Sequence, residues 1–357
     1  MTFNCFEYQL PFVTPLTTSN RTYAKRNGII LVYRTEQFEW YGEAAPLPGF
    51  SSEDIAEVKE KLITHKDHIN NILSAGKPIQ LLSKLYKREL IPASLQFGLD
   101  SLAYQIEAQN NNQRLVEHIF SEYEEKIPVN ALISLTDSSI LSRIQENKEN
   151  GYTTFKGKIG IDFDRELKLI KKIRSHFPDI TIRLDANQAW SLDQAISFCN
   201  DLAPLNIEYC EEPLTDNTPE NCETLSQNIP IPIALDESTT QHSYWPNLLP
   251  YTDYLILKPM VTGSFQKNFE TKRLANTHNN KVVVTTSLEG SVGRYFSGIL
   301  AAGIGSSQIA HGLSTRHLLK DDVLQDDSFV SNGYLAIMDC KLGTIDFNRQ
   351  QIFTNVF

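Results

Sequence analysis

A run of charged motifs between Lys156 and Lys258 sets the fold of this chain: Phe155-Lys156-Gly157-Lys158, Arg183-Leu184-Asp185-Ala186-Asn187, Glu211-Glu212-Pro213, Asp236-Glu237-Ser238 and Lys258-Pro259. Each motif ends a short run of apolar or β-branched residues, and successive motifs are 22 to 27 residues apart. One strand, one helix and two loops need about that length of chain. Each motif is therefore expected to close one strand-helix unit at the same edge of a parallel sheet.

The rhythm of strand and helix extends beyond these motifs in both directions. Eight strands with helices between them predict a closed parallel α/β barrel, in which catalytic residues gather at the carboxyl ends of the strands. The helix-like stretches 165–176 and 192–202 fill two of the gaps. The expected strands are 127–134, 152–159, 180–187, 206–213, 231–237, 253–259, 281–287 and 307–312.

The two ends of the chain differ from this central region. Residues 3–9, 28–33 and 38–43 read as antiparallel strands, and helices are expected at 52–75, 80–90 and 92–110. The prediction is an α+β domain over residues 1–110, a barrel over 111–315, and a segment, 316–357, that returns to the opening domain.

Composition limits the class of protein. With 357 residues, 41% hydrophobic and 21% charged, the chain is expected to be globular. Its formal charge of −10 argues against nucleic acid or an anionic membrane as partner. The five cysteines are scattered without a C-x-x-C pair, and neither a signal peptide nor a long apolar run is seen. A cytoplasmic location is predicted, and the oligomeric state stays open.

Three acids, Asp185, Glu211 and Asp236, end three successive expected strands. Neighbouring strands lie about 4.8 Å apart, so these carboxylates would repel one another unless a cation neutralised them. Mg²⁺ prefers such oxygen ligands and keeps room for water and substrate, and Mn²⁺ shares this preference. Zinc is disfavoured because no histidine or cysteine joins the set. The alternative is that each acid caps a helix or pairs with a basic neighbour.

Three lysines are expected at the same edge. Lys156 and Lys158 point to one face of their strand, and Lys258 ends the strand opposite them across the barrel. Burial, a like charge or a metal lowers the pKa of a lysine, which makes it a usable base. A metal could hold a substrate carboxylate while one lysine removes the α-proton and the other stabilises the enediolate. The alternative is a structural network of lysines and acids.

Substrate contacts are expected from four places. Arg183 and Asn187 share a strand face with Asp185. The stretch from Thr285 to Arg294 follows the seventh strand, where barrels often bind anions, and it contributes Ser287 and Glu289. The loops at 15–22 and 44–52 should close over the substrate and contribute Ser19 and Phe50. Whether Glu212 or Glu237 has a metal-binding role is left open.

Taken together, the five motifs resemble the enolase superfamily and, within it, the muconate-lactonizing group. The loop Gly42-Glu43-Ala44-Ala45-Pro46-Leu47-Pro48-Gly49-Phe50-Ser51 and the segment Leu257-Lys258-Pro259 look most like the o-succinylbenzoate synthase family. This resemblance covers nearly the whole chain. It implies a modified TIM barrel of the (β/α)7β type, with a capping domain built from the N-terminal region and the C-terminal tail.

The resemblance also implies a reaction. The family dehydrates 2-succinyl-6-hydroxy-2,4-cyclohexadiene-1-carboxylate, a small anionic carboxylate, to 2-succinylbenzoate through an Mg-stabilised enediolate in menaquinone synthesis. By this likeness Lys158 is the general base and then protonates the departing hydroxyl. Lys258 stabilises the enediolate as a cation, and Lys156 assists near the carboxylate. The implied Mg²⁺ ligands are Asp185, Glu211 and Asp236.

Other functions fit parts of the pattern. Lysines on opposite faces also suit an N-succinylamino acid racemase, and muconate cycloisomerase is a further possibility. A dipeptide epimerase is disfavoured, because Ala310-His311-Gly312-Leu313-Ser314 lacks the acidic pair expected after the eighth strand. Outside the superfamily, a barrel lysine could form a Schiff base as in an aldolase. A non-catalytic binding barrel is the remaining alternative.

Overall fold

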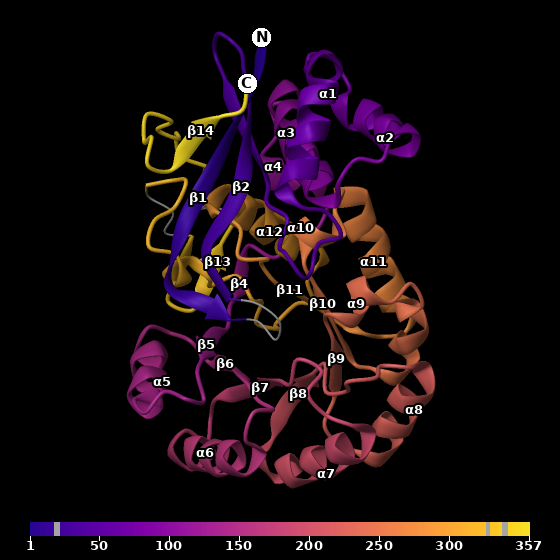
Figure 1. Cartoon of the computed structure of the whole chain (residues 1–357), viewed down its shortest axis with the longest axis vertical. Helices are drawn as coiled ribbons and strands as arrows, with labels where there is room; N and C mark the ends of the chain where they lie inside the picture. The colour runs from indigo at the N-terminus through magenta and orange to yellow at the C-terminus, as the bar shows by residue number, and fades with distance from the viewer. Residues whose placement is uncertain (18–21, 326–328, 338–341) are drawn as a thin grey trace.

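The central region folds into the expected parallel sheet, which curves around as a barrel (Figure 1). The computed structural model describes residues 1–17, 22–325, 329–337 and 342–357. The order of the sheet, β11-β10-β9-β8-β7-β6-β5, follows the order of the chain, as successive strand-helix units require. Its strands are β5 (Ala131–Ile133), β6 (Thr154–Lys158), β7 (Thr181–Asp185), β8 (Ile207–Glu211), β9 (Ile233–Leu235), β10 (Tyr254–Leu257) and β11 (Lys281–Val284).

The expected eighth strand, residues 307–312, forms two isolated bridges instead of a regular strand. His311 pairs with Val129, just before β5, and Gly312 pairs with Thr285, just after β11. The amide of His311 donates to Pro128 at 2.8 Å, and that of Gly312 donates to Val284 at 2.9 Å. His311 thus bonds to the chain beside β5, and Gly312 bonds to the chain beside β11. These bonds close the ring of strands, although the pairing is too short to form a regular strand.

Helices surround the barrel, and their apolar faces pack on the sheet. In α7, Ser191 and Gln194 form a capping box that starts the helix, and Ala195, Cys199 and Leu202 lie buried on one face. No helix in the described ranges is long and apolar enough to cross a membrane. The helices are α4 (Leu115–Ile119), α5 (Ile140–Glu149), α6 (Phe163–His176), α7 (Leu192–Leu202), α8 (Pro219–Asn228), α9 (Ser238–Gln241), α10 (Pro259–Thr262), α11 (Phe265–Thr277) and α12 (Ser291–Ile304), with 3-10 turns Ala203–Leu205, Trp245–Tyr251 and Arg316–Leu318.

The opening region forms a separate antiparallel sheet in the order β14-β1-β2-β3. The tail strand β14 pairs with β1, so the last residues lie on this sheet, beside the N-terminal strands in Figure 1. Its elements are β1 (Thr2–Thr17), β2 (Thr22–Arg34), β3 (Glu39–Ala44), α1 (Ile55–Leu73), α2 (Pro78–Arg88), α3 (Ala93–Asn110) and β14 (Phe353–Asn355); a small second sheet joins β4 (Lys126–Pro128), β13 (Tyr334–Ala336) and β12 (Val330–Ser331).

Two expectations for the first half of the chain need correction. The expected strand 127–134 is split, because β4 pairs with β13 while only β5 joins the barrel. The expected loop at 15–22 is shorter, since β1 continues to Thr17 and β2 starts at Thr22. Residues 18–21, which include Ser19, lie outside the described residues.

The capping domain packs closely on its own helix and on the barrel. A Cβ on Gly42 of β3 would lie 2.1 Å from the carbonyl oxygen of Gly98 in α3, so only glycine permits this approach. Two residues further along α3, Asp100 is buried and reaches across to the barrel. Its carboxylate accepts the amide of Phe265, the first residue of α11, and the hydroxyl of Tyr86, both at 2.8 Å.

The buried Asp100 predicts a pH dependence of stability. Burial raises its pKa to about 7, although the hydrogen bonds from Phe265 and Tyr86 lower it. The folded-state pKa therefore lies above the unfolded one, so the protonated group stabilises the fold fully below about pH 4 and this contribution is lost as the pH rises through about 7. Asn does not ionise, so Asp100→Asn should lose this decline in stability. Between pH 5 and 8 the wild-type unfolding free energy should fall relative to that of the variant by on the order of 2 kcal/mol.

Urea unfolding of both proteins at several pH values measures this difference. Asparagine can still accept from Phe265 and donate to the Tyr86 hydroxyl, so the variant is expected to fold. Parallel stability curves for the two proteins across this range would contradict the assignment.

Candidate active site

The strand register brings the charged motifs to one end of the barrel. Lys158 on β6 pairs with Asp185 on β7, and Asp185 pairs with Glu211 on β8. Asp236 comes directly after β9, and Lys258 directly after β10. In the closed ring, three strand positions separate β6 from β10 in either direction, counting the bridged segment at His311 and Gly312 as one position. The lysines of the second and sixth strands therefore face one another across the barrel mouth.

A cavity of about 910 Å³ opens at this end. Small-molecule sites usually measure about 300 to 1,000 Å³, so this cavity is large enough for a substrate with a ring and a side chain. Its wall combines charged groups of the barrel with apolar residues of the capping loop. The lining includes Lys156, Lys158, Asp185, Asn187, Asp236, Lys258, Thr285, Thr286, Leu288, Leu47 and Phe50.

Lys156 bridges two of the three acids. Its Nζ atom lies 2.9 Å from Asp185 and 2.7 Å from Glu211. Burial by itself lowers the pKa of Lys156, but the charges of Asp185 and Glu211 outweigh burial and raise the pKa well above its ordinary value. In the metal-free site the two carboxylates therefore hold Lys156 as a cation, and a lowered pKa beside a bound metal stays a prediction.

Lys258 is held in a similar way on the other side. Its ammonium pairs with Asp236 and lies 4.4 Å from the centre of the Phe50 ring, which places a capping-loop aromatic directly over it. Burial lowers its pKa, but Asp236, Glu237 and Glu211 raise it above the ordinary value. A lowered pKa of Lys258 beside a bound metal likewise stays a prediction. By contrast, Lys158 is exposed at the cavity wall and forms no ion pair with any described residue.

The acids at this edge outnumber the lysines that neutralise them. Glu211 is fully buried, and its Oε2 atom has no hydrogen-bond partner among the described residues. Burial and the nearby charge of Asp185 raise the pKa of Glu211. Burial raises the pKa of Glu237 to about 8. Its Oε2 atom also has no hydrogen-bond partner among the described residues, while its Oε1 atom accepts from Asn187 at 2.8 Å. The site therefore holds a surplus of buried oxygen acceptors.

These residues fit a divalent cation that prefers oxygen ligands. The donor set of Asp185, Glu211 and Asp236 is all carboxylate, which suits Mg²⁺ or Mn²⁺ better than zinc. Among the described residues no three such side chains already form a metal cluster. Lys156 pairs with Asp185 and Glu211, and Lys258 pairs with Asp236. The assignment of the three acids as metal ligands stays a prediction.

Glu212, whose role the sequence leaves open, ties two of the strand ends together. It is fully buried and accepts the amides of Asp236 at 2.7 Å and Ser238 at 2.9 Å. The Ser238 hydroxyl and the Asn217 amide also donate to it, at 2.8 and 2.6 Å. Its backbone φ of 41° lies in the left-handed region. Glu212 therefore holds Asp236 in place. In the sequence, its position next to Glu211 was the one signal of a role.

Replacing Glu212 by Gln should weaken Mg²⁺ binding. The amide would face the donating Asn217 group, so the segment that carries Asp236 would shift. Loss of such a supporting contact typically lowers metal affinity by about 10- to 100-fold, and calorimetric titration with Mg²⁺ measures it. Asp253→Asn is the matched control, because Asp253 holds the amide of Ile233 at the opposite end of β9. Equal Mg²⁺ affinity in the Glu212 variant and the wild type would rule out this role.

The expected contact of Arg183 with substrate is not supported. Arg183 is fully buried and lies beneath the cavity without lining it. Its guanidinium pairs with Glu208 at 2.5 Å, donates to the Ala310 carbonyl at 2.6 Å and lies over the Tyr209 ring. Arg183 pairs in register with Lys156 and not with Lys158, which places it one layer deeper in the barrel than Asp185.

The remaining expected contacts divide into two groups. Asn187 and Phe50 line the cavity. Ser287 and Glu289 do not line it; both are buried, and Glu289 turns towards α12. Glu289 accepts the amide of Ser287 and, at 2.8 Å, the hydroxyl of Ser297. Ser19, the last expected contact, lies outside the described residues. From the same stretch, Thr285, Thr286 and Leu288 line the cavity instead.

Fold and site together define a class of proteins. Its members have a parallel barrel with a capping domain, carboxylates at three successive strand ends and lysines at the ends of opposite strands. Residues 140–344 match the family described as enolase C-terminal domain-like, which covers more than half of the chain. The chain belongs to this family. Residues 1–104 match the family described as MenC, N-terminal domain.

Individual relatives agree with this assignment. An o-succinylbenzoate synthase from Haemophilus influenzae is 26% identical over 327 residues, which span 90% of this chain and 92% of the relative. The enzyme of the same name from Pasteurella multocida is 25% identical over 303 residues, 82% of each chain. The solved structure of muconate lactonizing enzyme from Pseudomonas fluorescens superposes with a TM-score of 0.81 at 19% identity, over 94% of this chain and 93% of that one. This last likeness confirms the capped-barrel fold.

Proposed function

We propose that this protein is an o-succinylbenzoate synthase, a hydro-lyase of the enolase superfamily that acts in menaquinone biosynthesis. The observation that carries the proposal is the placement of lysines at the ends of two opposite strands, β6 and β10, around three carboxylates, of which Asp185 and Asp236 line the same cavity. Relatives of that name align with 82 to 92% of their own length. The MenC N-terminal match covers the capping domain. It therefore supports this particular member of the superfamily, which a match of the barrel alone would not do.

In this proposal Asp185, Glu211 and Asp236 hold the divalent cation, Mg²⁺ or Mn²⁺. Members of the superfamily generally depend on such a metal. When bound, the cation would bind the substrate carboxylate and offset the negative charge that develops there as the α-proton leaves. Lys156 lies between Asp185 and Glu211 and supplies further positive charge beside the same carboxylate.

Lys158 is proposed to carry the proton. It lines the cavity and forms no ion pair with a described residue, so its amine is available to the substrate. In the first step its neutral amine takes the α-proton of the cyclohexadiene carboxylate, and the electron pair of the C–H bond moves towards the carboxylate. In the second step the C–O bond breaks, the ammonium returns the proton to the departing hydroxyl, and water and the aromatic ring are formed.

Lys258 is proposed to act from the opposite face as a fixed cation. Its pairing with Asp236 and its place under Phe50 hold the ammonium at the cavity wall. There it would stabilise the negative charge of the intermediate without moving a proton. The same arrangement of lysines would allow racemisation of an N-succinylamino acid, so the test must include that substrate class.

Lys158→Ala should abolish turnover without preventing Mg²⁺ binding, because it removes the proposed base and none of the three acids. We expect kcat to fall about a thousandfold or more while calorimetry shows an Mg²⁺ affinity close to that of the wild type. Lys148→Ala is the control, since Lys148 pairs with Asp179 at 2.7 Å, away from the cavity. Substantial remaining activity in the Lys158 variant would remove it as the base.

The function is tested by supplying purified protein with the cyclohexadiene carboxylate and, separately, with N-succinyl amino acids of both hands. We expect aromatic product from the first substrate, loss of activity in EDTA and its recovery with Mg²⁺. Racemisation without dehydration would assign the other reaction. Activity that persists in EDTA, together with borohydride trapping of a substrate adduct, would indicate a Schiff-base enzyme and overturn the proposal.

A further inference from the structure

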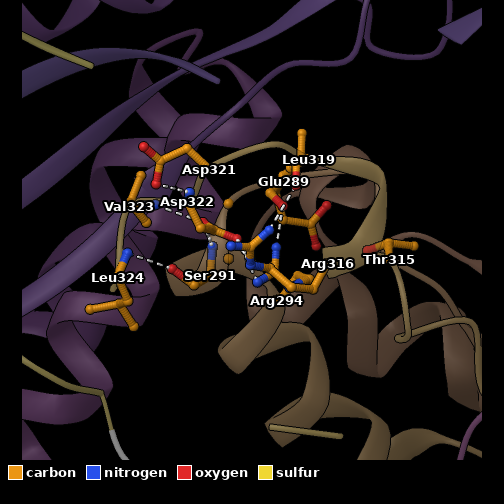
Figure 2. A network of polar contacts seen from close by, with 12 residues as sticks. Glu289, Ser291, Arg294, Thr315, Arg316, Leu319, Asp321, Asp322, Val323 and Leu324 are labelled. Atoms are coloured by element: carbon orange, nitrogen blue, oxygen red, sulfur yellow. Dashed lines mark hydrogen bonds and ion pairs between the residues drawn. The ribbon is translucent and has the colours of Figure 1, made fainter. Parts of the chain in front are cut away.

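The first turn of α12 is held by carboxylates that come from two other parts of the chain. A helix start leaves backbone amides without partners inside the helix, and here the capping position is Gly290, which has no side chain. Asp322 of the C-terminal segment accepts the amide of Ser291 at 2.7 Å and pairs with Arg294 at 2.7 Å. Figure 2 shows this network, in which Asp322 lies over the start of the helix.

The capping domain supplies the second carboxylate. Glu43, in β3, is fully buried and accepts the amide of Gly290 at 2.7 Å on Oε1 and that of Gly293 at 2.8 Å on Oε2. The hydroxyl of Tyr8 also donates to Oε1. A Cβ on Gly290 would lie 3.1 Å from Glu43, so glycine allows this close approach. Glu43 thus caps a barrel helix from another domain.

The chain on both sides of this contact leads to the cavity wall. After β3 the capping loop carries Leu47 and Phe50 into the cavity, and Phe50 covers Lys258. Before α12 the barrel loop carries Leu288 into the same cavity. Arg26 joins the two loops, because it donates to the carbonyls of Leu288 at 3.1 Å and Pro46 at 2.8 Å.

We propose that Glu43 is a positioning residue that sets the capping loop against the barrel and thereby fixes Phe50 over Lys258. Both of its carboxylate oxygens are needed, because each one accepts the amide of a different glycine in the same helical turn. A shift of Glu43 would move the start of the capping loop, seven residues before Phe50, relative to the barrel wall at Leu288. The effect on substrate binding rests on the proposed function, whereas the effect on the capping loop does not.

Glutamine cannot replace Glu43 without loss. Whichever way its amide is turned, an NH₂ group faces the amide of Gly290 or Gly293, and that donor loses its acceptor. Asp100 offers a matched contrast, since it is also a buried carboxylate of the capping domain beside a tyrosine and the start of a barrel helix. Asp100 accepts only one backbone amide, that of Phe265, so asparagine can keep both of its hydrogen bonds.

The experiment compares Glu43→Gln, Tyr8→Phe and Asp100→Asn with the wild type at pH 8. This pH lies above the pKa of about 7 to which burial raises Glu43, so the wild-type group is mostly ionised. One readout is KM and kcat for the cyclohexadiene carboxylate with saturating Mg²⁺. The other is amide hydrogen exchange of residues 45–51, which needs no substrate.

In Glu43→Gln we expect KM to rise about tenfold, with kcat changed less than threefold, and faster exchange of the capping loop. Tyr8→Phe should shift both readouts in the same direction by a smaller factor, and Asp100→Asn should change neither. Unchanged loop exchange in Glu43→Gln, or an equal rise of KM in Asp100→Asn, would overturn the inference. If Glu43→Gln does not fold, wild-type loop exchange in Tyr8→Phe overturns it. Absence of dehydratase activity in every protein would reject the function alone.

Discussion

The structure depends on the neutralisation of carboxylates that parallel strands force together at one edge of the barrel. Asp185 and Glu211 are paired in register on adjacent strands, and Asp236 follows on the next. Their mutual repulsion in a buried place would be costly without cations close by. The Nζ atom of Lys156 lies 2.9 Å from Asp185 and 2.7 Å from Glu211 and so offsets the repulsion between these two carboxylates. The same constraint makes the edge a favourable place for a divalent metal.

The three lysines differ in their contacts with these acids. Lys156 and Lys258 are bound to acids, and the acids raise the pKa of both, so they are suited to act as fixed positive charges. Lys158 projects from the same strand as Lys156 but lies at the exposed wall of the cavity. Position along a single strand therefore separates a lysine that is paired with acids from one whose ammonium lies free of ion pairs with the described residues.

The capping domain is seated on the barrel by buried carboxylates at helix starts. Asp100 accepts the first amide of α11. Glu43 accepts the amide of Gly290, the capping position of α12, and that of Gly293 in its first turn, while Asp322 of the C-terminal segment accepts the amide of Ser291 between them. A carboxylate in such a place satisfies amides that the helix itself cannot satisfy and interacts favourably with the helix dipole. The two Glu43 contacts define direction as well as energy, so they set how the loop that carries Phe50 approaches Lys258.

Much of this protein could be predicted from the sequence alone, because periodic features survive without knowledge of contacts. The recurrence of motifs every 22 to 27 residues is a consequence of strand-helix units, and it predicted the barrel and the meeting of Asp185, Glu211, Asp236 and the lysines. Depth along a strand could not be predicted in this way. Arg183 alternates with its neighbours as Lys156 does, yet it ends below the cavity, where Glu208 and Ala310 hold it. Nor could the sequence show that Glu289 turns inward or that Glu43 caps a helix 247 residues away. Those outcomes depend on long-range packing, in which a side chain takes the partner that folding brings nearest.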